Sequence, residues 1–263
     1  MNLGLTGKRA IVLAGTSGLG RGTATALASE GARVVVCGRS PERTRAVAGE
    51  IAAATGNGTV AGLPCDVSNG ADLERFFAEA TAELGGIDIL VANAGGPPAG
   101  GFDALTDATW AQAFELTLMS VVRSIRLALP SMRAAGRGSI VVIGSSSVRA
   151  PIKNLTLSNA YRPAVQALCK DLATNLAPEG VRVNVVSPGR IDTPRIRELD
   201  GKASEREGIS LEQARARSVA SIPLGRIGTV EEFGRVAAFL ASDASSYVTG
   251  VSLLVDGGLV TSL

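Results

Sequence analysis

The stretch Ala14-Gly15-Thr16-Ser17-Gly18-Leu19-Gly20 decides the fold, and it lies near the N-terminus of a chain of 263 residues. It follows the apolar run 10–13 and precedes an Ala-rich helical pattern at 21–29. In such a strand–turn–helix unit Gly15 permits the tight turn, Gly18 lets the backbone approach a pyrophosphate, and Gly20 allows close helix–strand packing. The N–H groups at the start of the helix then face the anion. This context favours a dinucleotide site over a purely structural turn.

Apolar runs typical of strands alternate with helical patterns along the whole chain. The runs are continuously apolar, as expected of strands buried on both faces, and lie at 10–13, 34–37, 59–63, 87–92, 139–143, 181–186 and 252–255. Helical patterns lie at 21–29, 42–54, 72–83, 107–135 (interrupted by Pro130), 164–176 and 230–240. The alternation predicts a doubly wound α/β fold in one domain over residues 1–263. Its seven-stranded, mostly parallel sheet forms the middle layer of a three-layer sandwich.

Residues 193–221 are polar and contain no strand-like run, and their positive and negative charges are nearly balanced. Two interpretations stay open for this segment. It is either a solvated surface helix or a lid that covers the carboxyl edge of the sheet.

Composition and charge exclude several classes of protein. The chain has 26 Lys and Arg against 24 Asp and Glu, interspersed, which argues against a nucleic-acid partner. No run of 18 apolar residues is present, and residues 1–9 lack an apolar leader, so we expect a cytoplasmic protein without a membrane partner. The chain has no His, which excludes a His-based triad or metal site, and no Cys pair or acidic cluster has metal-ligand spacing.

Four further motifs follow the glycine turn in order. They are Cys65-Asp66-Val67, Ala92-Asn93-Ala94-Gly95, Ser187-Pro188-Gly189-Arg190-Ile191-Asp192-Thr193 and the stretch 250–258, which reads GVSLLVDGG. With the glycine spacing Gly-x-x-x-Gly-x-Gly, the whole chain resembles the short-chain dehydrogenase/reductases, and closely their 3-oxoacyl-ACP reductase-like branch. The resemblance implies a Rossmann-type fold, a nicotinamide cofactor and a small-molecule substrate.

The same resemblance implies which residues contact the cofactor: Gly15, Thr16, Ser17, Gly18, Leu19, Gly20, Asp66, Val67, Asn93, Gly95, Arg162, Pro188, Gly189 and Ile191. Charge indicates which cofactor it is. NAD-binding proteins place a carboxylate after the second strand to bind the ribose 2′-OH. Here that stretch is Gly38-Arg39-Ser40, and Arg39 and Ser40 could hold a 2′-phosphate. We therefore predict NADP rather than NAD, the alternative being that Arg39 is simply an exposed loop residue.

The catalytic pattern departs from the family. Ordinary members use Asn, Ser, Tyr and Lys, with Tyr as the acid/base and Lys lowering its pKa and binding the nicotinamide ribose. Ser145 matches the Ser, and the family's spacing, fixed by the stretch 164–168, places Ser158 at the Tyr position and Arg162 at the Lys position. Thr117 stands at the Asn position. One of the four standard residues remains.

This departure changes the chemistry that we expect. A Ser hydroxyl is a far weaker acid than a phenol, whose ordinary pKa is about 10. Arg162 can clamp a ribose, but its guanidinium cannot relay a proton. Tyr161 is a candidate substitute donor, although a three-residue shift rotates its side chain by about 60° and moves it one turn along a helix; a packed or rim tyrosine is the competing interpretation. Pro163 indicates either that the helix begins there or that it is kinked.

Three functions remain open. The sequence favours an NADP-dependent oxidoreductase that acts on a carbonyl, an alcohol or a related group with a non-standard proton donor. The alternatives are a non-redox lyase or isomerase on the same scaffold, and a catalytically silent nucleotide-binding homologue. The family resemblance also implies a homo-oligomer, dimer or tetramer, formed through the apolar segments 108–129, 164–176 and 252–263.

Overall fold

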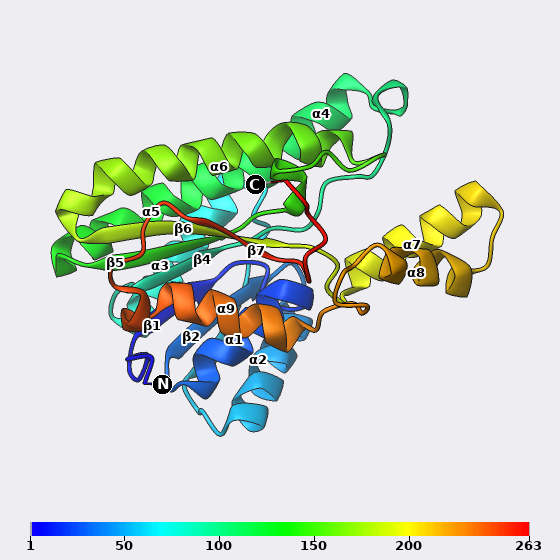
Figure 1. Ribbon diagram of the computed structural model, residues 1–263. Coiled ribbons are helices and arrows are strands. Elements are labelled where there is room, and N and C mark those ends of the chain that lie inside the picture. The colour runs from blue at the N-terminus through cyan, green and yellow to red at the C-terminus, as the bar shows by residue number, and fades with distance from the viewer. Residues whose placement is uncertain (1, 263) are drawn as a thin grey trace.

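Seven parallel strands form one sheet in the computed structural model, which describes residues 2–262 (Figure 1). The strand order is β3-β2-β1-β4-β5-β6-β7, so the direction of winding reverses between β1 and β4. The strands are β1 (Arg9–Val12), β2 (Arg33–Gly38), β3 (Val60–Pro64), β4 (Ile89–Ala92), β5 (Gly138–Ile143), β6 (Val181–Pro188) and β7 (Ser252–Val255). The predicted doubly wound parallel sheet is confirmed.

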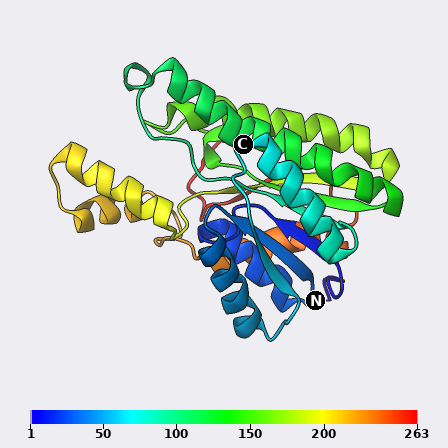
Figure 2. The same cartoon turned by 180° about the vertical axis from the view of Figure 1, so that it is seen from behind.

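Helices cover both faces of the sheet (Figures 1 and 2). One face packs against α1 (Gly18–Ser29), α2 (Pro41–Thr55) and α9 (Val230–Ala241). The other packs against α3 (Gly70–Leu84), α5 (Ser120–Ala135) and α6 (Thr156–Leu176). Each face has its own apolar core, since strand residues alternate between the two clusters: Ile11 belongs to one and Val12 to the other. This explains why the strands are apolar without a break.

Two helices differ from the sequence-based expectation. The interruption predicted at Pro130 is wrong, because α5 continues through Pro130 to Ala135. The break lies earlier, where a π-helical turn (Glu115–Met119) joins α4 (Asp107–Phe114) to α5. Pro163 also lies inside a helix, eight residues into α6, so the helix does not begin there. A proline in a helix interior leaves the carbonyl of residue i−4 without its backbone partner, here that of Asn159.

A pair of helices, α7 (Pro194–Glu207) and α8 (Leu211–Ala220), projects from the body beyond the sheet (Figure 1). Thr193 caps α7 by accepting a hydrogen bond from the Ile196 N–H (3.3 Å). Ser210 and Gln213 form a reciprocal capping box at the start of α8. None of the helices in residues 2–262 is long and apolar enough to cross a membrane.

Close backbone contact joins α1 to α9. A Cβ at Gly22 would lie 2.5 Å from the Val230 carbonyl oxygen, and a Cβ at Gly234 would lie 2.4 Å from the Gly22 carbonyl oxygen. Both distances are shorter than any ordinary contact, and both involve backbone atoms that cannot turn aside. The two glycines therefore set the separation of the helices.

We expect Gly234→Ala to lower the free energy of unfolding by about 1–3 kcal/mol, because the added methyl group forces α9 away from α1. Gly49→Ala is the matched control. Gly49 is exposed in α2 and a Cβ there would contact nothing within 4 Å, so alanine should raise stability by about 0.5–1 kcal/mol. Urea unfolding followed by circular dichroism measures both changes. Equal effects of the two substitutions would contradict the close-contact argument.

Candidate active site

A pocket of about 590 Å³ lies at the carboxyl edge of the sheet, between the ends of the strands and the bases of α7 and α8. Its floor comes from the segments that follow β1, β4, β5 and β6. This is the point at which the winding reverses, where open parallel sheets bind their ligands. Residues at the start of α7 and the end of α8 close one side, including Arg195, Leu199 and Ser218.

The glycine turn presents the start of α1 to this pocket. Ser17 occupies the N-terminal cap, but its side chain makes no capping hydrogen bond. The N–H groups of the first helical turn are thus available to an anion, and Ser17, Gly18 and Leu19 line the pocket. A side chain is excluded at Gly15, since a Cβ there would lie 2.8 Å from the Cβ of Val36. These residues fit the pyrophosphate of a dinucleotide.

Two further segments named by the sequence line the same pocket. Asn93 and Gly95 follow β4, and Asn93 Nδ2 donates to the Ala14 carbonyl oxygen at 3.4 Å. Pro188 is the last residue of β6, and Gly189 and Ile191 follow it. The predicted nucleotide residues after three different strands are therefore within one cavity.

The end of β2 lies against the glycine turn. A Cβ at Gly38 would lie 2.6 Å from Thr16 Cγ2. Arg39 is exposed directly after β2, and Ser40 caps α2 by accepting from the Arg43 N–H (3.3 Å). A cation and a helix start therefore lie next to the turn.

The third strand ends beside this point, because the Cys65 N–H donates to the Gly38 carbonyl oxygen at 2.9 Å. Asp66 follows, and its carboxylate accepts from the backbone and hydroxyl of Ser68 at 3.0 and 2.7 Å. Val67 is buried beneath it. Asp66 and Val67 lie outside the pocket described above but at the same edge of the sheet.

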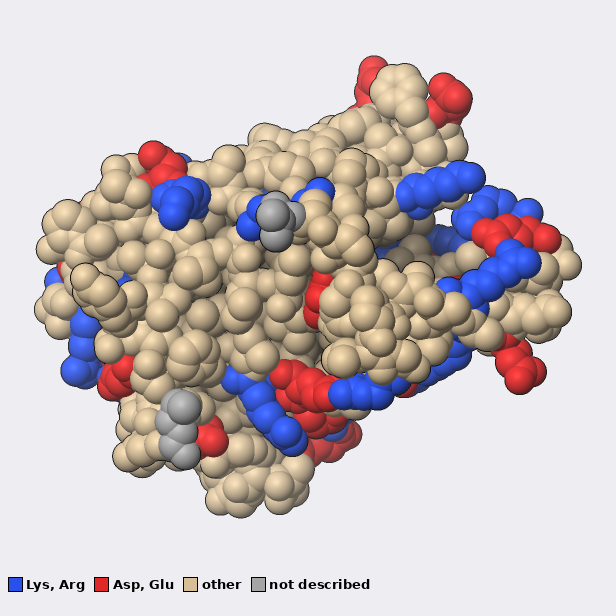
Figure 3. Space-filling view, viewed as in Figure 1, with Lys and Arg blue, Asp and Glu red and all other residues tan. Residues whose placement is uncertain are grey.

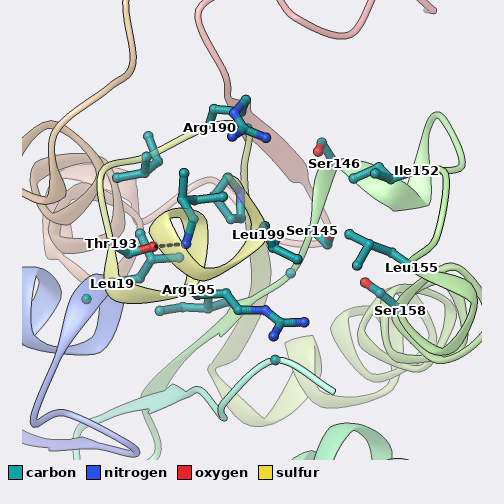
Figure 4. A pocket seen from close by; sticks show the side chains of 18 of the residues that line it. Leu19, Ser145, Ser146, Ile152, Leu155, Ser158, Arg190, Thr193, Arg195 and Leu199 are labelled. Carbon is teal, nitrogen blue, oxygen red and sulfur yellow. Dashed lines mark hydrogen bonds between the residues drawn. The ribbon is translucent and has the colours of Figure 1, made fainter. Parts of the chain in front are cut away.

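A row of serine hydroxyls connects β5 to α6. Ser145 follows β5, faces the pocket (Figure 4), and accepts a hydrogen bond from the Ser147 N–H at 3.1 Å. The hydroxyls of Ser147 and Ser158 are 3.2 Å apart, and both side chains are buried. Ser158 also lines the pocket. Ser147 thus links Ser145 to Ser158, through its backbone N–H on one side and its hydroxyl on the other.

Arg162 lies one turn after Ser158 on the same face of α6 and is 7% exposed. Its Nη1 donates to the Ile143 carbonyl oxygen at 2.8 Å. No Asp or Glu within residues 2–262 forms an ion pair with it. Burial lowers the pKa of its guanidinium to about 10, so the group stays charged at neutral pH. A buried cation without a carboxylate partner therefore forms part of the pocket wall.

Tyr161 and Thr117 are directed elsewhere. The Tyr161 hydroxyl donates to the Trp110 carbonyl oxygen at 3.1 Å, and its ring packs against Trp110 and Phe114. Tyr161 is not among the pocket-lining residues of the described chain. Thr117 is fully buried in the π-helical turn, and its hydroxyl finds no partner within residues 2–262.

Several charged and apolar residues that the sequence did not indicate come to the pocket from the segment after β6, from α7 and from the C-terminal segment. Arg190 and Arg195 line it, as do Leu199 and Leu259. Arg190 was quoted only as part of a motif, and Arg195 only as one charge in a polar segment. Nothing in their spacing signals that they face a cavity.

Comparison with known proteins places this site in a family. A profile of the enoyl-(acyl carrier protein) reductases matches residues 13–260. The oxidoreductase asL5 of Sarocladium schorii is 37% identical over 255 residues, covering 97% of this chain and 96% of that protein. The 3-oxoacyl-[acyl-carrier-protein] reductase FabG of Escherichia coli is 34% identical over 255 residues, covering 96% and 97%. The chain belongs to the short-chain dehydrogenase/reductase family.

A solved structure of this family has nearly the same fold. L-sorbose reductase from Gluconobacter frateurii, complexed with NADPH and L-sorbose, superposes with a TM-score of 0.93 at 29% identity, and each chain is covered completely. The protein is thus a short-chain dehydrogenase/reductase type of oxidoreductase. The assignment of Ser158 and Arg162 to the family's Tyr and Lys positions stays a prediction from the residue spacing.

Removing the buried charge of Arg162 should stabilise the free protein. The lowered pKa corresponds to a desolvation cost of about 3 kcal/mol, and the lost bond to Ile143 costs about 1–2 kcal/mol in return. We expect Arg162→Met to raise the free energy of unfolding by about 1 kcal/mol and to weaken NADPH binding. Urea unfolding and fluorescence titration measure the two effects.

Arg182 supplies the matched control, because it is also largely buried but donates to five oxygens. These belong to Leu240, Ser245, Val248, Ser139 and Ser242. Arg182→Met removes all five of these charge-assisted hydrogen bonds, although the carbonyls of Leu240, Ser242 and Val248 keep other donors, and should lower stability by about 3 kcal/mol. If Arg162→Met destabilised the protein to the same extent, Arg162 would be a structural arginine, not a poised functional one.

Proposed function

We propose that this protein is an NADPH-dependent reductase of small carbonyl compounds in which Ser158 and Arg162 replace the usual tyrosine and lysine. One observation carries the proposal: the open N-terminus of α1 and the group Ser145, Ser158 and Arg162 face the same pocket. That pocket is large enough for a nicotinamide and a small substrate together. The likeness to a reductase structure that holds NADPH supports the choice of cofactor.

Each residue has a defined role in this proposal. NADPH, when bound, supplies the hydride. Arg162 holds the nicotinamide ribose through its free N–H donors, and its fixed charge stabilises the negative charge that develops on the substrate oxygen. The hydroxyls of Ser145 and Ser158 donate hydrogen bonds to that oxygen, and Ser147 supports Ser158 at 3.2 Å.

Proton transfer is the weak step of this site. A serine hydroxyl has an acidity close to that of the alcohol product, so it provides little driving force for protonation. Arg162 favours the ionised form of the neighbouring Ser158 hydroxyl electrostatically but cannot exchange its own proton. Tyr161, whose hydroxyl is bonded to Trp110, is placed to support the helix packing instead. We expect turnover of ordinary ketones to be slow.

The loss of the tyrosine and lysine also supports a second candidate, a nucleotide-binding homologue without catalysis. NADPH oxidation across a panel of ketones and aldehydes separates the two. Binding of NADPH without reduction of any of these compounds would favour the silent homologue.

Assembly into a dimer or tetramer stays a prediction. Leu253 of the edge strand β7 is exposed, and residue 263 of the predicted interface segment lies outside the described residues.

The charge after β2 predicts the choice between NADPH and NADH. The exposed Arg39 next to the Ser40 cap should favour the 2′-phosphate, so NADPH should bind at least about tenfold more tightly than NADH. Arg39→Ala should remove most of this difference. Arg126→Ala, which removes an exposed arginine on α5, is the control and should leave it unchanged. Equal affinities for the two cofactors in the unmutated protein would contradict the assignment.

Restoring the family's residues tests the roles of Ser158 and Arg162. The double change Ser158→Tyr and Arg162→Lys should raise kcat on simple ketones, and by more than the two single changes combined, because a phenol and an ammonium act as one unit. Adding Pro163→Ala should increase the gain if the proline displaces the helix. Steady-state NADPH oxidation measures the series.

An unmutated protein that already reduces ordinary ketones with a kcat of about 10 per second would overturn this assignment. Tyr161→Phe would then be the first variant to examine.

A further inference from the structure

Three arginines and no acidic residue line the pocket within residues 2–262: Arg162, Arg190 and Arg195. A pocket that holds only positive charge favours a ligand with negative charge. The three arginines differ in whether an acidic residue of the protein already compensates their charge.

Arg190 is balanced. It forms an ion pair with Asp200, which is 3% exposed on α7, and Ser218 also donates to that carboxylate. The ion pair joins α7 to the segment after β6, and the Ser218 hydrogen bond joins α8 to α7. Arg162 is occupied by the ribose and the substrate oxygen in the proposed function. Arg195 is the pocket cation that neither role explains.

Arg195 extends across the pocket from the first turn of α7. Figure 4 shows its side chain directed from the helix toward the side where Ser145 and Ser158 lie. Its Nη2 donates to the Pro97 carbonyl oxygen at 2.6 Å, and a Cβ at Gly96 would lie 2.9 Å from its Nε. The guanidinium is thus fixed between α7 and the loop after β4, and this contact joins residues that are 98 positions apart.

The charge of Arg195 is only partly compensated. Its Nη1 pairs with Glu198 at 3.1 Å, but the same carboxylate also accepts from Lys202 Nζ at 2.7 Å. One acid therefore serves two cations. Figure 3 shows several Lys and Arg side chains at the edge of the hollow between the helical pair and the body, with acidic side chains among them. A guanidinium carries five N–H donors, which suit a second, bidentate acceptor.

The wall beside this cation is apolar. Ile152 and Leu155 precede α6, and Ile196 and Leu199 belong to α7; all four line the pocket. Leu199 lies between Arg195 and Ser145 in Figure 4, and Ile152 and Leu155 lie beyond Ser145, so the pocket that Arg195 and Ser145 share has apolar surface that suits methylene groups. A substrate that fits has a carbonyl at one end, an apolar body and an anionic group at the other end.

We propose that the substrate carries a carboxylate or a phosphate, and that Arg195 binds this anion and sets the substrate specificity. The inference rests on the proposed reductase function for the reaction itself. Arg195 binds the anion whether or not the substrate is then reduced. Anion binding and reductase activity are therefore testable separately.

Matched pairs of neutral and charged ketones test the specificity. Pyruvate, acetoacetate and laevulinate are compared with their methyl esters, and dihydroxyacetone phosphate with dihydroxyacetone, as substrates with NADPH. We expect the charged member of at least one pair to have a kcat/KM about tenfold or more above its neutral partner. The two kinds of pair distinguish a carboxylate from a phosphate. Equal values in every pair overturn the inference and leave the reductase function standing.

Variants at position 195 test the residue. Arg195→Gln keeps a donor near Pro97 and removes the charge, so kcat/KM for the charged substrate should fall about 10- to 100-fold, while that of the neutral partner changes little. Arg195→Lys should retain part of the preference. Arg197→Gln, on the same helix but outside the pocket and paired with Asp192, should retain all of it. If Arg195→Gln leaves the preference unchanged and instead weakens NADPH binding, the guanidinium serves the cofactor phosphates and the inference is wrong.

If no ketone is reduced, a binding measurement still tests whether Arg195 binds the anion. The same acids and esters are titrated into the protein saturated with NADP⁺, followed by calorimetry. Selective binding of the charged compounds that is lost in Arg195→Gln supports the inference even though the reductase function has failed. Absence of such a preference in the unmutated protein overturns it.

Discussion

The position of Gly20 against the end of β1 is the constraint on which the site depends. A Cβ at Gly20 would lie 2.4 Å from the Ala14 carbonyl oxygen and 2.7 Å from Asn93 Nδ2. The backbone of α1 therefore touches the turn after β1 and the segment after β4 at once. This contact fixes the open N-terminus of α1 relative to both strands at the reversal point of the sheet. An anion bound at the start of α1 would therefore be positioned by backbone geometry.

Arg162 shows the cost that the site imposes on the fold. A lysine in this position could lose its proton when buried, but an arginine with a pKa of about 10 remains charged at neutral pH. The Ile143 carbonyl accepts one hydrogen bond from Arg162, but it is neutral and does not compensate the positive charge. The protein thus retains a destabilising cation where the sheet edge faces a ligand. Proteins retain such destabilising groups mainly at functional sites, because there the compensating negative charge comes from the ligand or develops during the reaction.

Sequence patterns predicted the sheet well because each strand is buried on both faces, which makes the apolar runs continuous. Residue spacing also placed Ser158 and Arg162 one helical turn apart, and the structure brings both to the pocket. The π-helical turn at Glu115–Met119 could not be predicted from the pattern, because the added residue shifts the apolar periodicity by one position and the eight residues of α4 are too few to define the periodicity before it. Pro130 misled for the opposite reason: its local preference is strong, but packing of α5 against the sheet overrides it.

The segment 193–221 shows the limit of reading charge from sequence. Arg190, Arg195 and Arg197 are spaced within one short stretch, yet they have three different environments. Arg190, which precedes α7, is half-buried and pairs with the buried Asp200; Arg195 spans the pocket to Pro97, and Arg197 forms an exposed pair with Asp192. These differences depend on contacts between residues that are distant in the sequence and on where each arginine lies relative to α7. Because α7 begins with its capping residue Thr193 at the pocket, Arg195, Ile196 and Leu199 line the site, whereas Arg197 and most residues at the end of the helix are exposed. A single helix therefore presents some side chains to water and others to the pocket, which a count of its charges could not predict.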